Sequence, residues 1–224
     1  LILIIVLSVI YIVDELASSV RGVVDVQTTR DLFNVVYPSS EYDNASATLG
    51  FVTMAGYLTY LISPFYKSLA DKYGRRIFLI INTIGMGVGM LICIISKSIA
   101  VYIVGAVIMT FFTPNDMQVI YIMECAPKEH RAKLCSITKG LALISVSSLG
   151  LFVKLFVNDA APSTWRNVFI IPIILAFAIG IAAIYFVRET PVYTQKRLEY
   201  LKSSEEERAA AAKAEKAAQE KVKE

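Results

Sequence analysis

The sequence is short of charge, histidine and cysteine, and each shortage excludes a class of protein. Only 18% of its 224 residues are charged and 56% are hydrophobic, whereas a soluble domain has about 25% charged and about 45–50% apolar residues. The net charge of +3 is too small to indicate a nucleic-acid partner. One histidine and three scattered cysteines exclude a metal-ligand pattern and a disulfide framework. The composition therefore indicates a membrane protein.

The sequence also lacks the motifs of the common enzyme classes. It contains no glycine-rich nucleotide loop, no nucleophile triad and no cluster of metal ligands. We therefore expect neither a cofactor nor enzymatic activity.

Six segments are apolar over about the 20 residues that a helix needs to cross a bilayer. They are residues 1–20, 47–66, 77–96, 99–123, 134–157 and 167–187. The first has no basic lead of the kind that precedes a signal peptide, so we expect the sequence to begin inside or just before a spanning helix. The third contains Gly85 and Gly89, small residues four positions apart that let helices approach closely.

Basic residues gather in alternate connections between these segments. Lysine and arginine are frequent in three connections and scarce in the three between them: residues 67–76, 124–133 and 188–224 against residues 22–44, 97–98 and 158–166. By the positive-inside rule, the first group faces the cytosol. The sequence therefore predicts an all-α, multi-pass protein of the plasma membrane, with a six-helix bundle over residues 1–188 and both ends in the cytosol. We expect residues 22–44 to form an external loop.

Residues 189–224 differ in character from the rest and are expected to form a cytosolic helical tail or linker. Ser204-Glu205-Glu206-Glu207 has the capping-box pattern of a helix N-terminus, and the Ala/Glu/Lys run after it favours a solvated helix. The run has no continuous apolar stripe, which favours a surface helix over one that lies on the membrane or docks to a partner.

A compact charged motif, Leu69-Ala70-Asp71-Lys72-x-Gly74-Arg75-Arg76, connects the second and third apolar segments. Gly74 allows a tight turn, and we expect Asp71 at the positive end of the following helix. The motif resembles the signature loop of the major facilitator superfamily, although Lys67 stands where that signature begins with glycine.

Two further motifs carry the same resemblance. Glu124-x-x-Pro127-x-x-x-Arg131 follows the fourth segment, and Arg188-Glu189-Thr190-Pro191-x-Tyr193 follows the sixth. Both resemble signatures of the sugar-porter and related metabolite-transporter branches, although Val192 stands where a basic residue is common. The resemblance implies the amino-terminal half of such a carrier, built as an inverted repeat of three plus three helices. It also implies a second six-helix half, which this sequence does not contain.

The charged motifs form a candidate gate. Arg75, Arg76 and Arg131 can pair with Glu124 and Glu189 at one membrane surface, holding the inner helix ends together until the pore opens inward. Alternatively, these are ordinary positive-inside residues with solvated partners, each pair worth about 0–1 kcal/mol. The candidate gate residues are Asp71, Lys72, Gly74, Arg75, Arg76, Glu124, Pro127, Arg131, Arg188, Glu189 and Pro191.

Acidic residues inside the apolar segments mark a candidate substrate path, because a charge there costs about 2.5–3.5 kcal/mol. Asp14 and Glu15 lie in the first segment, and the run Pro114-Asn115-Asp116 lies in the fourth. The first and fourth helices correspond in the inverted repeat that the resemblance implies, so both would line the central cavity. We expect Asp14 or Glu15 to carry a coupling proton and Asp116, beside Asn115, to touch the substrate.

Other polar residues extend this candidate site. Tyr57, Tyr60 and Gln118 are possible contacts for a hydroxylated substrate, and Lys139 in the fifth segment is a possible mobile cation. Two alternatives stay open. Asp14 can form a structural pair with Arg21, which is seven positions later on the same helix face. Lys139 can instead extend its amine to the inner membrane surface.

These observations predict a secondary transporter that moves a small polar metabolite, a sugar or an organic acid, by alternating access with proton coupling. The expected partners are the substrate, a proton, the lipid bilayer and the second six-helix half. One alternative is a drug or cation exporter of the same superfamily. Residues 140–150 lack the Gly-Pro element that drug–proton antiporters of the superfamily carry in this span, which counts against this alternative. Another is a six-helix module that acts alone as a scaffold or by self-association.

Overall fold

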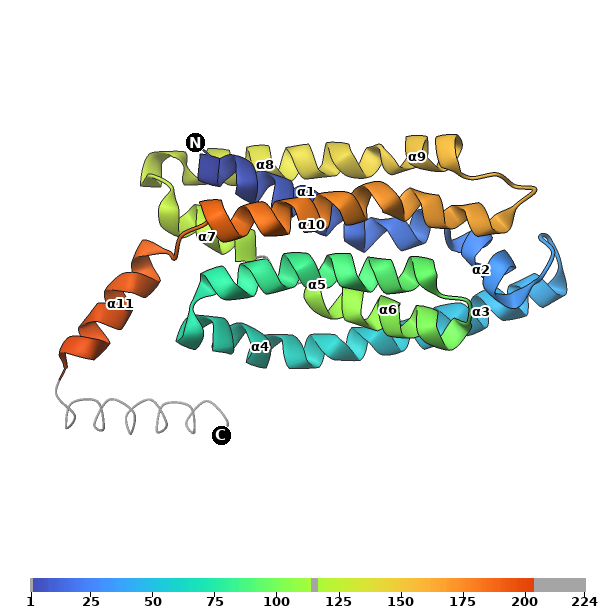
Figure 1. The fold of residues 1–224 in the computed structure, drawn as a ribbon, viewed down its shortest axis with the longest axis horizontal. Helices are drawn as coiled ribbons and strands as arrows, with labels where there is room; N and C mark the ends of the chain where they lie inside the picture. Colours follow the sequence, from blue (N-terminus) through green and yellow to red (C-terminus); the bar gives the residue numbers. More distant parts are fainter. Residues whose placement is uncertain (1, 114–116, 204–224) are drawn as a thin grey trace.

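A computed structural model describes residues 2–113 and 117–203 of the chain. Most of these residues form one elongated bundle of helices that run along its long axis, and α11 projects from one end (Figure 1). The described part contains no β-strand beyond one isolated bridge. The elements are α1 Ile2–Val23, α2 Asp25–Phe33, α3 Ser40–Met54, η1 Ala55–Leu58, α4 Thr59–Tyr73, α5 Arg75–Ile95, α6 Ile99–Phe112, α7 Met117–Cys125, η3 Lys128–His130, α8 Arg131–Ser147, α9 Leu149–Phe156, η4 Pro162–Phe169, α10 Ile170–Phe186 and α11 Pro191–Lys202.

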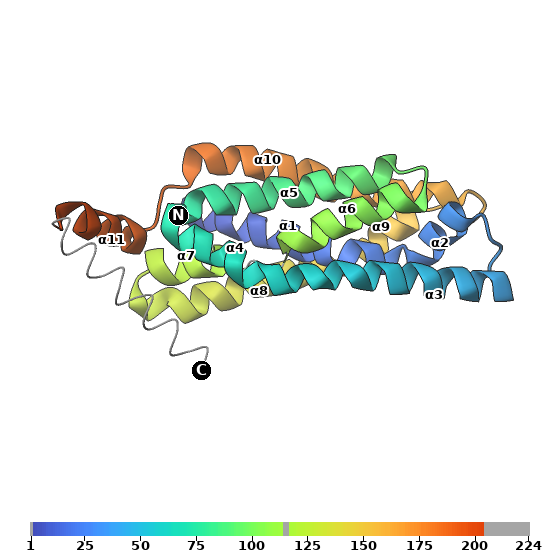
Figure 2. The ribbon, with the colours of Figure 1, turned by 90° about the horizontal axis from the view of Figure 1, so that it is seen from below.

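Six helical segments of the described part are long and apolar enough to cross a membrane. They are Ile2–Val23, Ser40–Tyr73, Arg75–Ile95, Ile99–Cys125, Lys128–Phe156 and Pro162–Phe186. Each overlaps one of the six apolar segments found in the sequence, so the prediction of an all-α, six-helix membrane bundle is confirmed. The second segment is one nearly continuous rod of α3, η1 and α4 (Figure 2).

The prediction that residues 22–44 form a loop is wrong, because most of this stretch is helical; its predicted external position stays a prediction. α2 buries Thr28 and Thr29 while its other residues remain at least partly accessible. It packs against η4 and ends at Asn34, whose backbone is left-handed with φ 54°. A short helix buried on one face has a polar composition, which is why it resembles a loop in the sequence.

α1 is the central helix of the bundle. It packs against α5, α7, α8 and α10 and contributes to both hydrophobic clusters of the core. One cluster surrounds the buried ring of Trp165 and the other surrounds Tyr121. The buried Asp14 on α1 therefore lies inside the bundle.

α5 and α6 approach so closely that glycine is required at their contact. A Cβ on Gly89 would lie 2.6 Å from the backbone nitrogen of Met109, and a Cβ on Gly105 would lie 2.8 Å from that of Cys93. Gly85 faces the ring of Phe112. The predicted close helix approach at Gly85 and Gly89 is confirmed.

Two spans are covered little by the rest of the chain. In the most apolar 18-residue stretch of Ser40–Tyr73 and of Lys128–Phe156, only 18% and 17% of the residues are buried. In Arg75–Ile95 the corresponding share is 56%. Their exposed side chains are large and apolar, among them Phe51, Leu61 and Leu155. Both helices thus have apolar surface left for lipid or for another bundle of helices.

The described part of the tail, which was expected to be helical, contains the helix α11. α11 begins at Pro191, and the hydroxyl of Thr190 accepts a hydrogen bond from the backbone N–H of Tyr193, which caps the helix. The predicted capping box at Ser204 and the run after it lie outside the described residues.

We predict that Gly89→Ala lowers the free energy of unfolding by about 1–3 kcal/mol, because the new methyl group overlaps the backbone of α6. Gly150→Ala in α9 is the matched control, since its Cβ would meet nothing within 4 Å. Thermal unfolding of the two variants in detergent measures the difference. Equal stability of the two variants would contradict the close contact of α5 and α6.

Candidate functional site

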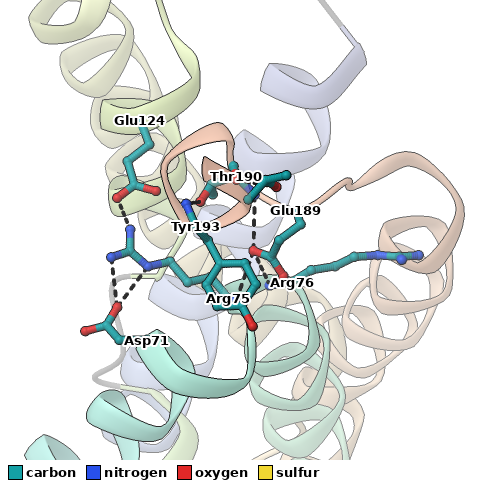
Figure 3. A network of polar contacts seen from close by, with 8 residues as sticks. Asp71, Arg75, Arg76, Glu124, Glu189, Thr190 and Tyr193 are labelled. Atoms are coloured by element: carbon teal, nitrogen blue, oxygen red, sulfur yellow. Dashed lines mark hydrogen bonds and ion pairs between the residues drawn. The ribbon is translucent and has the colours of Figure 1, made fainter. Parts of the chain in front are cut away.

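Charged side chains meet at one end of the bundle, here called the Arg75 end, where α4, α5 and α7 approach the chain that follows α10 (Figure 3). The Nε and Nη2 atoms of Arg75 donate to Oδ1 of Asp71 at 3.0 and 2.8 Å. Nη1 of Arg75 donates to Oε1 of Glu124. The side chains of Arg75 and Glu124 are each 15% exposed, against 66% for Asp71. The Arg75–Glu124 pair therefore joins α5 to α7 with little water around it.

Glu189 caps the N-terminus of α5. Its carboxylate accepts from the backbone N–H of Arg75 at 3.0 Å, of Arg76 at 3.2 Å and of Thr190 at 3.1 Å. A negative charge at this position is stabilised by the positive end of the helix. The expectation that Asp71 occupies this position is wrong, because Asp71 lies one turn before Arg75 and binds its guanidinium instead.

Gly74 makes this arrangement possible. Its φ of 111° lies in the region that favours glycine. A Cβ there would lie 2.6 Å from Oε2 of Glu189. The glycine of the motif thus serves both the turn between α4 and α5 and the approach of the Glu189 carboxylate.

Two arginines of the motifs do not pair as expected. Arg76 donates from Nη2 to the carbonyl oxygen of Ile184, and Arg131 donates from Nε to the carbonyl oxygen of Ala126 at 2.9 Å. Both bind backbone at the end of a neighbouring helical segment, so neither forms an ion pair with Glu124 or Glu189 in the described chain. The remaining motif residues are exposed: Lys72, Pro127, Arg188 and Pro191.

A second polar group lies in the middle of the bundle. Gln118 of α7 donates from Nε2 to Oδ2 of Asp14 on α1 at 3.0 Å, and both side chains are buried. Together with Asn82, Thr83 and Thr113 they line a cavity of about 10 Å³, roughly the space that one water needs. The structure thus brings together two of the residues that the sequence analysis selected independently.

Asn82 of α5 is a member of this group that the sequence analysis missed. Its Oδ1 accepts from the hydroxyl of Tyr66 at 2.8 Å, while its buried Nδ2 has no partner in the described part of the chain. The available signal was an amide within an otherwise apolar span, which costs free energy unless it is used.

The other selected residues lie apart from this cavity. Glu15 is half-buried on α1. The rings of Tyr57 and Tyr60 pack edge to face at 5.4 Å and are 52% and 43% exposed. Lys139 is exposed and lines a separate cavity of about 160 Å³ with residues of α1, α7 and α8. Asn115 and Asp116 lie outside the described residues.

The alternative of an Asp14–Arg21 ion pair is not realised. Arg21 donates from Nη2 to the hydroxyl of Thr110 at 3.2 Å. The ion pairs of the described chain involve Arg75 and Arg166 and not Arg21.

A further network at the opposite end of the bundle was also missed. Oδ2 of Asp31 on α2 accepts from Nε1 of the buried Trp165 at 3.0 Å and from Nη1 of Arg166. Arg166 also donates to the carbonyl oxygens of Ile94 at 2.9 Å and Ser96 at 2.7 Å, at the C-terminus of α5. This network fastens α2 and η4 to α5, and the one tryptophan of the sequence was its only signal.

We predict that Glu189→Ala lowers the free energy of unfolding by about 1–2 kcal/mol, because three backbone N–H groups lose their acceptor. Asp71→Ala is the matched control, since it removes an exposed ion pair worth about 0–1 kcal/mol. Thermal unfolding in detergent compares them. A Glu189→Ala variant as stable as the Asp71→Ala variant would show that the cap contributes nothing.

Comparison with known proteins places the chain in a family. Residues 22–216 match the Major Facilitator Superfamily. The human "Solute carrier family 2, facilitated glucose transporter member 12" is 32% identical over 127 residues, which cover 55% of this chain and 20% of that protein. "Glucose transporter GlcP" of Staphylococcus epidermidis is 27% identical over 125 residues, which cover 55% of this chain and 27% of that protein.

A solved structure shows the same fold. The chain superimposes on a D-xylose-proton symporter with a TM-score of 0.64 at 18% identity, covering 89% of this chain and 52% of that one. The chain thus spans about half the length of the symporter, and its matches cover about a fifth to a quarter of the curated relatives. Because the family match extends over most of its residues, this multi-pass membrane chain belongs to the Major Facilitator Superfamily.

Proposed function

We propose that the protein is a proton-coupled sugar transporter that works by alternating access, and that this chain is one half of its transmembrane core. The observation that carries the proposal is the buried contact between Asp14 and Gln118 at the centre of the bundle. Relatives named as glucose transporters and the fold shared with a D-xylose-proton symporter support a sugar as substrate over a cationic drug.

Asp14 has the surroundings that a coupling acid needs. A carboxylate within a span is costly unless it is neutralised or hydrogen-bonded. The amide of Gln118 offers both a donor and an acceptor, so it can bind Asp14 in the ionised and in the protonated state. Glu15 is only half-buried. Of the two candidates, we therefore assign the coupling proton to Asp14.

The cavity beside Asp14 supplies groups suited to a hydroxylated substrate. Gln118 and Asn82 bring amides, and Thr113 brings a hydroxyl. Small-molecule sites combine mostly apolar walls with a few polar groups of this kind. The present cavity holds about 10 Å³, so a sugar requires the helices to move apart or a second bundle to widen the site. The uncovered faces of Ser40–Tyr73 and Lys128–Phe156 fit such a partner bundle.

We assign the Arg75 end to the cytosol of a cell with this protein in its plasma membrane, because basic residues concentrate there. The little-exposed Arg75–Glu124 pair then acts as a latch between α5 and α7. Opening of the cytosolic side separates these helix ends and breaks the pair.

We predict that Asp14→Asn abolishes uphill sugar accumulation driven by a proton gradient but leaves sugar exchange intact, because an amide cannot take up the proton. Proteoliposomes with the full-length protein, an imposed pH gradient and labelled D-glucose or D-xylose measure both activities. Glu15→Gln, the matched control one position along α1, is expected to accumulate sugar like the wild type. Full accumulation by Asp14→Asn would reject Asp14 as the coupling acid and leave facilitated transport as the simpler function.

We predict that Glu124→Gln shifts the equilibrium between the outward-open and cytosol-open states about tenfold toward the cytosol-open state, because the partner of Arg75 loses its negative charge. A tenfold shift is equivalent to about 1.4 kcal/mol. The accessibility of a cysteine placed in the cytosolic half of the pore reports this balance. Glu129→Gln is the control, since Glu129 is exposed in η3 at the same end. The same accessibility in both variants would rule out the latch.

A further inference from the structure

We infer that Arg21 forms a subsite for a carboxylate on the transported molecule, so that the substrate is a sugar acid. This inference rests on the sugar transport proposed above and specifies its substrate class. Arg21 is a charged side chain within a span, and the proposed mechanism gives this side chain no role.

Arg21 lies in the last turn of α1, within the span Ile2–Val23. Its guanidinium makes one hydrogen bond in the described part of the chain, from Nη2 to the buried hydroxyl of Thr110 on α6. Its Nε is buried and has no partner among these residues. A guanidinium is always charged and carries a planar fork of donors. Most of this fork is therefore unused by the described residues.

No carboxylate of the described residues forms an ion pair with Arg21. Asp14, two turns earlier, accepts from Gln118. Asp25, one turn later, does not form an ion pair with Arg21. Partial burial raises the pKa of Asp25, and the nearby charge of Arg21 lowers it by a smaller amount. An intramembrane charge without a bonded counter-ion marks a substrate or ion pathway.

The surroundings of Arg21 suit a sugar acid. A Cβ on Gly56, the residue before Tyr57, would lie 3.6 Å from Oγ1 of Thr110, the partner of Arg21, and the rings of Tyr57 and Tyr60 pack edge to face. Both rings are about half exposed, so a sugar has apolar faces to pack on beside the guanidinium. The fork of Arg21 matches a carboxylate in bidentate geometry. The negative charge of Asp14 repels an anion, which orients the acid group toward Arg21.

The test compares one sugar with its own acid. Affinities of the full-length protein for D-glucose and D-glucuronate are measured by competition in proteoliposomes, at a pH where glucuronate is ionised. We expect the wild type to bind glucuronate at least about tenfold more tightly than glucose. Arg21→Gln removes this preference by weakening glucuronate binding at least about tenfold more than glucose binding, and Arg21→Lys retains part of the preference, because lysine keeps the charge without the fork. Lys97→Gln, an exposed cation outside the site, changes neither affinity.

Each outcome separates this inference from the proposed function. Equal wild-type affinities for glucose and glucuronate, with transport of both, overturn the subsite and leave sugar transport standing; this comparison needs no variant. Loss of both affinities in a folded Arg21→Gln protein also overturns the subsite. It would indicate that Arg21 forms an ion pair with an acidic residue elsewhere in the protein. Arg21-dependent transport of lactate without transport of either sugar supports the carboxylate subsite and overturns the sugar.

Discussion

The bilayer interior provides no hydrogen-bond partners, and most of this structure follows from that constraint. Helices satisfy the backbone, so each polar side chain within a span needs a partner from the chain or from a ligand. Thr83 bonds the carbonyl of Leu79 one turn earlier, and the Tyr66 hydroxyl bonds Asn82. Gln118 and Asp14 bond each other across α1 and α7. The buried atoms that have no partner among the described residues include Nε of Arg21 on α1 and Nδ2 of Asn82 on α5, and these two helices pack against each other.

In the proposed transporter, α1 would take part in both substrate recognition and proton coupling. It packs against α5, α7, α8 and α10, and it carries both Asp14 and Arg21. They are seven residues apart on one face, which separates an acid from a base by about two helical turns. A substrate carboxylate bound to Arg21 would offset the charge of the guanidinium and so change the electrostatic potential at Asp14. Binding and proton uptake would thereby influence each other without direct contact.

Sequence reasoning predicted those features whose causes are local. Six apolar lengths gave six spans, and Gly89 indicated a close helix contact because small residues recur one turn apart. Partners distant in the sequence were not predictable in the same way. Glu189 caps a helix that begins 114 residues earlier. The sequence around Asp71 gives no sign that Glu189, rather than Asp71, occupies the N-terminus of α5. Asp14 and Gln118 were chosen separately for their polarity, but only the packing of α1 on α7 joins them. The helix α2 was missed because its buried face is set by η4, far along the chain.

The network around Trp165 has a spectroscopic consequence. Trp165 is the one tryptophan of this sequence, and it is fully buried, with its indole nitrogen bonded to Asp31 and the guanidinium of Arg166 4.7 Å from its ring centroid. Indole emission depends on polarity and on nearby charges, and in this chain it arises from one ring, at the end of the bundle opposite Arg75. Trp165 thus lies where α2 and η4 are joined to α5 by hydrogen bonds. A change in its emission on substrate addition would show, without any label, that events in the cavity extend to that end of the bundle.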